Sequence, residues 1–371
     1  MLRWDLVVIG VGVVGYGYWG PNLVRNFAGI AGARVVAVSD LNGERLAQAE
    51  ARYPGIRTTR DFLELLRDPA VDAVAIATPI STHFSLALQA LQAGKHVLVE
   101  KPLAPSSDEA LRLIDEADRR RRVLMVDHTF LYTGAVRKIR ELVETGRLGH
   151  LYYYDSVRVN LGLFHPDVNV LWDLAVHDLS IMDYVVPHRP CAVSVTGVAS
   201  VGQMASIAYL TCFFENNFIA HFHVNWLAPV KVRRTLLCGD RQMIVYDDLE
   251  PDEKIKIYDR GITVRDATEG GENPIYQSMV DYRSGDMWAP RVDRTEALQN
   301  EALHFVECIQ TGARPMTDGE SGLRIVRILE AAERSLAQGG RRVELEEPLS
   351  LQARRLWRAH GSRGRRRAGE A

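Results

Sequence analysis

The stretch Gly15-Tyr16-Gly17-Tyr18-Trp19-Gly20 decides the fold of this chain, and the β-branched run Val11-Gly12-Val13-Val14 precedes it. The next residues, Pro21-Asn22-Leu23-Val24-Arg25, are typical of the first turns of a helix. A strand, a tight glycine turn and a helix start in this order form a cradle for a phosphate group. The first glycine allows the turn, the second lets a pyrophosphate approach the backbone, and the third lets the helix pack close to the strand.

The pattern G-x-G-x-x-G occurs twice, because Gly10-Val11-Gly12-Val13-Val14-Gly15 also fits it. If Gly10 opened the turn, the following helix would contain further glycines, at roughly 1 kcal/mol each, and an interior proline, at about 3 kcal/mol. With Gly15 as the opener, Pro21 falls in the first helical turn, where its missing N–H does no harm. We therefore assign the strand to residues 11–14 and the cradle to Gly15, Gly17 and Gly20, with a glycine-rich hairpin as the alternative for this motif alone.

A second buried-strand pattern, Arg34-Val35-Val36-Ala37-Val38-Ser39-Asp40, ends in an acid. Asp40 lies near the spacing at which a carboxylate binds the adenosine ribose hydroxyls of NAD. Leu41 and Asn42 follow, and Arg45 comes one helical turn later, so a 2′-phosphate would meet the carboxylate without an adjacent clamp. We expect NAD rather than NADP as the cofactor. A helix N-cap is a second, compatible interpretation of Asp40.

Composition bounds the class of protein. A chain of 371 residues exceeds the usual size of one hydrophobic core, so we expect two domains. The net charge of −2 offers no general attraction to nucleic acid or anionic membrane. No apolar run approaches the roughly 20 residues that span a bilayer, and Asp5 interrupts any signal-peptide core. The cysteines lie far apart without metal spacing, so we expect reduced cysteines in a cytoplasmic protein.

Residues 11–126 repeat a strand–helix rhythm, which includes a short capped helix expected over 58–66. Alternating strands and helices imply a parallel sheet with helices on both faces. Ligands of such sheets bind beyond the carboxyl ends of the strands. Asp40, Thr78 and Lys101 all fall at such ends.

From about residue 128 the rhythm changes to consecutive strand-like stretches joined by short turns, which predicts a mostly antiparallel sheet. A helix over 171–185 interrupts these strands, and further helices follow them. We predict three segments: an α/β cofactor-binding domain over 1–127, an α+β domain with a mostly antiparallel open sheet over 128–345, and a basic tail over 346–371. For the tail, a solvated chain end is favoured over a nucleic-acid contact.

Two groups of residues could carry chemistry. Lys101 stands in Glu100-Lys101-Pro102 at an expected strand end, where its ammonium could stabilise a developing alkoxide beside a nicotinamide. Asp173 and His177 are four residues apart and share one helix face, so the carboxylate could orient the imidazole as acceptor of a hydroxyl proton. A solvated loop lysine and a helix-surface pair are the alternatives. No third ligand is evident beside the pair, so we expect no metal.

Four motifs together resemble the Gfo/Idh/MocA family of glucose-fructose oxidoreductase, inositol dehydrogenase and their relatives. In order along the chain they are Gly15-Tyr-Gly-Tyr-Trp-Gly-Pro-Asn22, Thr78-Pro79-x-x-x-His83, Glu100-Lys101-Pro102 and Asp173-x-x-x-His177. The similarity spans residues 11 to about 340. It implies a Rossmann domain, a sheet domain for substrate binding and oligomerisation, and hydride transfer at a sugar carbon.

The resemblance also implies a role for each matching residue. The implied cofactor contacts are Gly15, Gly17, Tyr18, Trp19, Gly20, Asp40, Thr78, Pro79, His83, Glu100 and Lys101. Lys101, Asp173 and His177 match the catalytic trio. On the strand and loop that lead to the Asp173/His177 pair, the candidate substrate contacts are Arg158, Asn160, His165 and Asn169, with ordinary surface positions as the alternative.

Within the family, residues 19–22 and 167–173 look most like members that oxidise C3 of a sugar before transamination, on nucleotide sugars or on aminoglycoside antibiotic sugars. We expect His177 to take the C3 hydroxyl proton while Lys101 hydrogen-bonds that oxygen, and the reverse assignment stays open. The alternatives are a ketoreductase of a nucleotide-linked keto-sugar, an inositol or sugar dehydrogenase, and an NAD-binding sensor without turnover. We expect a cytoplasmic homodimer or homotetramer with no nucleic-acid or membrane partner.

Overall fold

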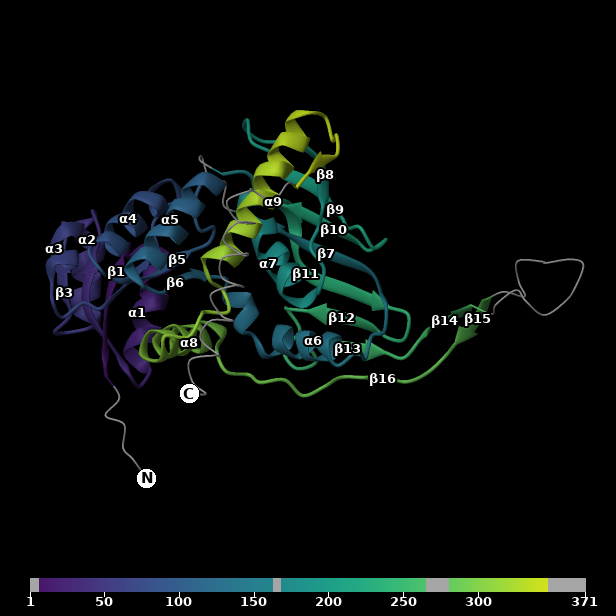
Figure 1. Cartoon of the computed structure of the whole chain (residues 1–371), viewed down its shortest axis with the longest axis horizontal. Helices are drawn as coiled ribbons and strands as arrows, with labels where there is room; N and C mark the ends of the chain where they lie inside the picture. The colour runs from purple at the N-terminus through teal and green to yellow at the C-terminus, as the bar shows by residue number, and fades with distance from the viewer. Residues whose placement is uncertain (1–6, 163–167, 265–279, 346–371) are drawn as a thin grey trace, which may run out of the picture.

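The computed structural model describes residues 7–162, 168–264 and 280–345. Its first sheet is parallel, with strand order β3-β2-β1-β4-β5-β6. The strands are β1 Ile9–Val14, β2 Ala33–Ser39, β3 Arg57–Thr59, β4 Ala73–Ile76, β5 His96–Glu100 and β6 Leu124–Asp127. The helices between them are α1 Gly20–Gly29, α2 Gly43–Arg52, α3 Phe62–Arg67, α4 Ile80–Gln92 and α5 Ser107–Arg120. The predicted α/β Rossmann architecture is confirmed (Figure 1).

Strand β1 is longer than expected and contains both early glycines. A Cβ on Gly10 would lie 1.8 Å from the carbonyl oxygen of Ala70, and one on Gly12 would lie 2.7 Å from the Leu65 side chain. Every residue of β1 is buried. The two glycines therefore let neighbouring segments approach the strand, while the turn itself opens at Gly15.

The capped helix expected over 58–66 was wrong at its start. Thr58 and Thr59 pair with β2 as part of β3, which suits β-branched side chains. Helix α3 begins at Phe62, and the Asp61 carboxylate caps it by accepting the backbone N–H of Leu63 at 2.8 Å. The residue that starts the helix is thus an aspartate rather than a threonine.

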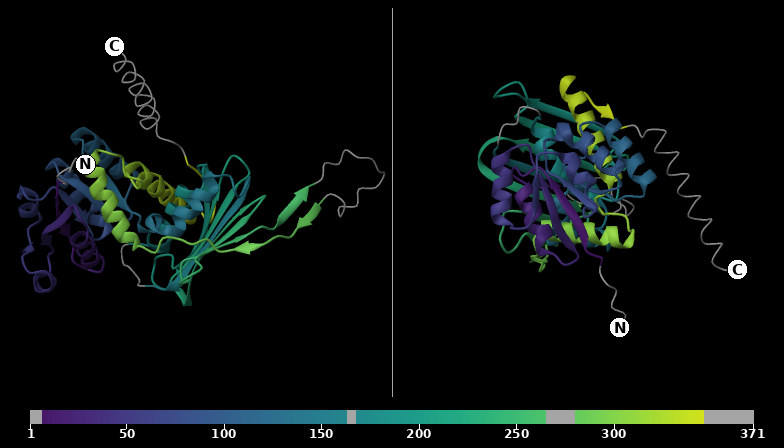
Figure 2. Two further views of the ribbon diagram at one scale, coloured as in Figure 1. Left: turned by 90° about the horizontal axis from the view of Figure 1, so that it is seen from below. Right: turned by 90° about the vertical axis from the view of Figure 1, so that its left-hand side faces the viewer.

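The second sheet has the order β16-β13-β12-β11-β7-β10-β9-β8-β17, and only the β10–β7 pairing in it is parallel among the described residues. Its strands are β7 Leu151–Leu161, β8 Ala192–Val198, β9 Ile207–Phe213, β10 Ile219–Asn225, β11 Leu227–Gly239, β12 Met243–Asp247, β13 Ile255–Tyr258, β16 Met287–Trp288 and β17 Val343–Glu344. The mostly antiparallel sheet is therefore confirmed. A separate pair, β14 Gly261–Val264 and β15 Val280–Arg283, extends away from the body (Figures 1 and 2).

Helices cover one face of this second sheet. They are α6 Gly134–Glu144, α7 Val176–Val185 and α9 Gly319–Ala337, with the short turns η1 Thr129–Tyr132 and η2 Leu171–Ala175. Helix α8 Ala297–Thr311 packs instead against α1 and η1 (Figure 1). The helix expected over 171–185 is thus a π-helical turn followed by α7. Tyr209 and Ile219 lie on the other face and are 44% and 43% exposed.

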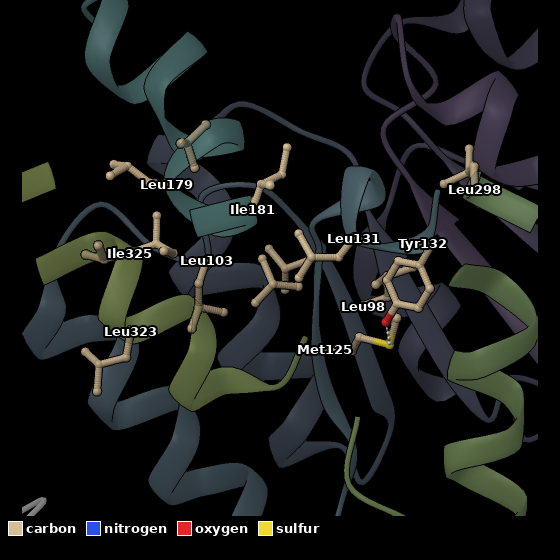
Figure 3. Close-up of a cluster of buried hydrophobic side chains, with 14 of the residues drawn as sticks. Leu98, Leu103, Met125, Leu131, Tyr132, Leu179, Ile181, Leu298, Leu323 and Ile325 are labelled. Carbon is tan, nitrogen blue, oxygen red and sulfur yellow. Dashed lines mark hydrogen bonds between the residues drawn. The ribbon is translucent and has the colours of Figure 1, made fainter. Parts of the chain in front are cut away.

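A continuous hydrophobic core joins the two sheets. Figure 3 shows buried side chains from β5, β6, α7 and α9 packed together, namely Leu98, Met125, Leu179, Ile181, Leu323 and Ile325. The Tyr132 hydroxyl lies among them, 4.0 Å from the sulfur of Met125. This shared core holds the carboxyl ends of β5 and β6 against the second sheet, so a site between them is built on rigid elements.

The boundary expected between residues 127 and 128 falls where β6 ends and η1 is about to begin, and the domain limits stay a prediction. The basic tail over 346–371 lies outside the described residues. All four cysteines are free thiols. Within the described ranges, none of the helices combines the length and apolarity needed to cross a bilayer.

Candidate functional site

The glycine turn after β1 leaves room for a ligand at one point and none at two others. Gly15 has φ +90°, and a Cβ there would lie 2.6 Å from the carbonyl oxygen of Ala77. A Cβ on Gly20 would lie 2.1 Å from the Gly15 carbonyl oxygen, so α1 packs directly on the turn. At Gly17 the nearest atom would be Nη1 of Arg45, 3.6 Å away.

The end of α1 beside this turn suits an anion. No side chain caps the N-terminus of α1. Pro21 has no backbone N–H, and Asn22 and Leu23 donate theirs to the carbonyl oxygen of Trp19, at 2.9 Å and 3.1 Å. Contacts to a phosphate would therefore come from the backbone of the glycine turn that leads into the helix. Trp19 is the residue before the helix, and the 81% exposed Tyr18 stands edge-on to it, with ring centroids 5.6 Å apart. Residues 15–20 therefore fit the pyrophosphate of a dinucleotide.

Asp40 is buried at the end of β2 and closes the turn. Its Oδ2 accepts the backbone N–H of Tyr16 at 2.6 Å, and its Oδ1 accepts that of Asn42 at 2.8 Å. The N-cap of α2 is Asn42, which accepts the N–H of Glu44, so the interpretation of Asp40 as the helix cap was wrong. The fold also brings Nη1 of Arg45 to 3.6 Å from Oδ2 of Asp40. The Asp40 carboxylate thus lies directly beside the glycine turn, and its contact with a ribose stays a prediction.

The loop after β4 carries Thr78, Pro79 and His83. His83 is buried, and its Nδ1 and Nε2 each lie 2.8 Å from a carbonyl oxygen, of Pro102 and Thr78 respectively. Burial lowers the pKa of His83, while the contacts with the two carbonyl oxygens oppose this. His83 therefore links the loop after β4 to the loop after β5. Its direct contact with the cofactor stays a prediction.

Lys101, at the end of β5, reaches across to the second sheet's domain. Its Nζ donates to the backbone oxygen of Asp173 at 2.9 Å and to Asp173 Oδ1 at 3.3 Å. The indole Nε1 of Trp226 donates to Oδ2 of the same carboxylate at 3.0 Å. Both carboxylate oxygens of Asp173 are thus engaged away from His177, and the expectation that Asp173 orients the imidazole was wrong. A cationic donor binds a carboxylate more strongly than a neutral imidazole does, so the Asp173 carboxylate pairs with Lys101 rather than with His177.

His177 lies in the first turn of α7 and is only partly exposed. Its Nδ1 is enclosed and has no hydrogen-bond partner among the described residues. The ring packs edge-to-face against Phe130, with centroids 5.0 Å apart. Burial, together with the positive charges of Lys101 and Arg158, lowers the pKa of His177 well below its ordinary value. The neutral form of the imidazole is therefore favoured.

Arg158 and Asn160, two of the expected substrate contacts, lie on β7. Arg158 is buried and pairs with Asp178, with Nε 2.5 Å from Oδ2 and Nη2 3.1 Å from Oδ1. Its Nη1 is buried without a partner in the described part of the chain. Asn160 is half-buried two positions further on, so it projects to the same face of the sheet. The ion pair fixes Arg158 as part of the wall beside His177.

The other two expected contacts fall in the loop before η2. His165 lies outside the described residues. Asn169 is described, and its side chain is used within the chain: Oδ1 accepts the backbone N–H of Leu171 at 2.9 Å, and Nδ2 donates to Oε1 of Glu333 at 3.1 Å. Asn169 thus links the start of η2 to α9, and its contact with substrate stays a prediction.

Sequence reasoning missed Phe130, Arg233 and Trp226. The guanidinium groups of Arg158 and Arg233 lie 4.6 Å and 5.5 Å from the centroid of the Phe130 ring, which also packs against His177. Its position just after the carboxyl end of β6 was the available signal. Trp226 follows β10 and is far from Asp173 in sequence, so no local pattern points to its hydrogen bond.

Glu100 lies behind Lys101 in a buried acidic cluster with Asp127 and Glu301. Its Oε2 accepts the backbone N–H of Lys101 at 3.0 Å. Burial and the facing Asp127 raise the pKa of Glu100 well above its ordinary value, which favours its neutral form. Among the described residues, no group of three or more histidine, cysteine or acidic side chains is arranged to hold a metal ion.

Comparisons with known proteins match both halves of the chain. The model described as "Oxidoreductase family, NAD-binding Rossmann fold" matches residues 9–128, and the model described as "GFO/IDH/MocA C-terminal domain" matches residues 136–245. Together the two models cover more than half of the chain.

Individual relatives are dehydrogenases. UDP-N-acetylglucosamine 3-dehydrogenase from Acidithiobacillus ferrooxidans is 29% identical, over 86% of this chain and 95% of the relative. A solved structure of that enzyme has a TM-score of 0.74 and 27% identity, covering 89% of this chain and 98% of its own. Inositol 2-dehydrogenase 2 from Saccharopolyspora erythraea is 34% identical over 48% of this chain and 54% of the relative. The structure titled GenD2 from gentamicin A biosynthesis, in complex with NAD, shares the fold, with a TM-score of 0.75 and 22% identity over 94% of this chain and 99% of its own.

Proposed function

The chain belongs to the Gfo/Idh/MocA family of NAD-dependent oxidoreductases, and we propose that it oxidises a pyranose hydroxyl at C3 to a 3-keto sugar. When bound, NAD accepts the hydride from the carbon. The 3-keto product is the substrate that a transaminase needs, so the reaction prepares the synthesis of an amino sugar or of an aminoglycoside sugar. A ketoreductase acting in the reverse direction would use the same groups.

One observation carries this proposal: Lys101, from the cofactor-binding sheet, bonds Asp173, one helical turn before His177. An ammonium has three N–H donors. Asp173 takes two of them, so one remains for the oxygen of a substrate alcohol. A positive charge at that oxygen stabilises the alkoxide that develops as the carbon loses hydride.

We assign the proton to His177. Loss of hydride from an alcohol carbon also requires loss of the hydroxyl proton, and a neutral imidazole can accept it. The lowered pKa of His177 keeps the ring unprotonated before the reaction. Asp173 then acts by holding Lys101 in place, because its carboxylate is bonded to Lys101 and Trp226.

The cofactor contacts proposed from the family pattern lie along one line of strand ends. Gly15, Gly17, Tyr18, Trp19 and Gly20 would hold the pyrophosphate, and Asp40 the adenosine ribose. Thr78, Pro79, His83, Glu100 and Lys101 follow at the ends of β4 and β5. Arg158, Asn160, His165 and Asn169 are proposed for the substrate side.

Position C3 is supported by the 3-dehydrogenase relative, which this chain resembles over almost the whole length of both. A second candidate, oxidation of an inositol hydroxyl, is favoured by relatives named inositol 2-dehydrogenase. Two of them match about half of this chain, and myo-inositol 2-dehydrogenase from Thermotoga maritima matches 91% of it at 23% identity. The uncovered sheet face with the exposed residues Tyr209 and Ile219 supports a homodimer or homotetramer. Light scattering of the purified protein measures the mass of the assembly and tests this.

The test is a panel of UDP-N-acetylglucosamine, an aminoglycoside and myo-inositol with NAD, followed by absorbance at 340 nm. Reduction of the product with borodeuteride and NMR then locates the label on the ring. Label at C3 of a pyranose supports the proposal, and turnover of myo-inositol alone moves the assignment to the second candidate. Tight NAD binding with no turnover of any sugar or cyclitol refutes the enzyme and favours the sensor.

A further inference from the structure

A cavity of about 490 Å³ is lined by Asn169, one of the proposed substrate contacts. It lies between η2, the start of α4 and the C-terminal half of α9. Two of its lining residues are the direct chain neighbours of proposed site residues: Trp172 precedes Asp173, and Ile80 follows Pro79. This volume is in the range of small-molecule sites. Asn169 therefore connects this cavity to the proposed substrate side of the site.

The walls of the cavity are mainly apolar, with one charge. Apolar side chains that line it include Trp172, Val168, Met204 and Leu336. Among the described residues that line it, Glu333 is the one ionisable group. A negatively charged phosphate would therefore meet a carboxylate here and no lining cation.

Glu333 is both accessible and held in place. It is exposed on α9, and its Oε1 accepts the Nδ2 group of Asn169 at 3.1 Å. Desolvation by the surrounding side chains raises the pKa of Glu333, while the hydrogen bond from Asn169 opposes this. A cation at the carboxylate would replace the solvation that the apolar walls remove.

We propose that this cavity binds a protonated amino group on a ring attached to the reacting sugar, with Glu333 as the charge partner and Trp172 as the stacking surface. The inference rests on the proposed function and assigns its substrate class, an amine-bearing glycoside. An apolar ring face and a positively charged amine are what an aromatic wall and a single carboxylate recognise together. The attached diphosphate of a nucleotide sugar has the opposite charge and finds no partner in this cavity.

The experiment is calorimetric binding to the NAD-loaded protein, with neamine, fully N-acetylated neamine and UDP-N-acetylglucosamine as probes. Acetylation removes the positive charges of neamine and leaves its rings. The variant is Glu333→Gln, and the matched control is Glu250→Gln, which removes a carboxylate from an exposed turn after β12. Neither residue belongs to the proposed catalytic set.

We expect Glu333→Gln to weaken neamine binding about tenfold, the order expected for a hydrogen bond to a charged group. Glu250→Gln should leave it unchanged, and acetylated neamine should bind the wild type no better than neamine binds Glu333→Gln. Equal neamine binding by wild type and Glu333→Gln, or no binding of neamine by the wild type, overturns the inference. Oxidation of UDP-N-acetylglucosamine at C3 together with that outcome would leave the proposed function standing and remove only the amine site.

Discussion

Replacing Lys101 by methionine separates the proposed charge of Lys101 from its bulk. The Lys101 side chain is 13% exposed and its partner Asp173 is 22% exposed, so the ammonium acts in a site with little water. Loss of one such donor to a developing oxyanion lowers kcat by about 10²- to 10³-fold, roughly 3–4 kcal/mol. We therefore expect kcat of Lys101→Met to fall within this range.

The same change has a smaller effect on folding. Asp173 keeps its hydrogen bond from Trp226 and loses the one from Lys101. A partly exposed carboxylate that loses one of two partners costs about 1 kcal/mol of unfolding free energy. The control is Lys138→Met, which removes a half-buried lysine paired with Glu141 on α6 and should change neither kcat nor NAD binding.

The assay measures initial rates at 340 nm with saturating NAD, and NAD affinity by calorimetry. Lys101→Met should bind NAD within about threefold of the wild type, since pyrophosphate and ribose contacts lie elsewhere; a threefold change is roughly 0.7 kcal/mol. A fall in kcat of less than about tenfold would refute the assignment of the substrate oxygen to Lys101. A fall in NAD affinity as large as the fall in kcat would place Lys101 in the cofactor site alone.

Three further predictions concern the ring of His177, the cofactor and pH. Phe130→Leu removes the aromatic contact that positions the unbonded His177 ring. We expect kcat to fall about tenfold and the acid limb of the pH–rate profile to shift, and Phe130→Tyr should restore both. An unchanged kcat and pH–rate profile in Phe130→Leu would contradict this. Asp40→Ser removes a negative charge that would repel the 2′-phosphate of NADP, and it leaves Arg45 nearby as a partner for that phosphate. The KM for NADP should therefore fall relative to the KM for NAD. An unchanged ratio of the two KM values would remove Asp40 from the ribose site. Burial lowers the pKa of His128 from 6.5 to about 4, so the folded state binds fewer protons than the unfolded state between these values. Stability should be complete above pH 6.5 and fall by roughly 3 kcal/mol towards pH 4, and urea unfolding should show a shallower loss for His128→Gln.

The order of the motifs along the chain was enough to predict most of the fold. The glycine turn, the strand that ends at Asp40 and the strand that ends at Glu100 are local patterns, and each depends on residues within a few positions of one another. The errors in the fold were local too. The threonines Thr58 and Thr59 suit a helix cap by their local chemistry, but in the structure they pair with strand β2 as part of the sheet.

The candidate site was predictable as a set of residues and not as a set of contacts. Spacing suggested that Asp173 serves His177, because residues four apart share a helix face. In the structure the Asp173 carboxylate accepts hydrogen bonds from Lys101 and Trp226, and the His177 ring packs against Phe130. Spacing along one helix carries no information about a competing donor from another element.

By itself, then, the sequence determined the class of each half of the chain, the position of the dinucleotide turn and the identity of the charged groups near it. The tertiary structure alone decided the partners: Lys101 meets Asp173 across 72 residues, Trp226 meets Asp173 across 53, and Asn169 meets Glu333 across 164. The physical reason is range. Backbone geometry and hydrophobic periodicity act over one or two turns of chain, whereas a buried charge is satisfied by whichever donor the packed core brings to it.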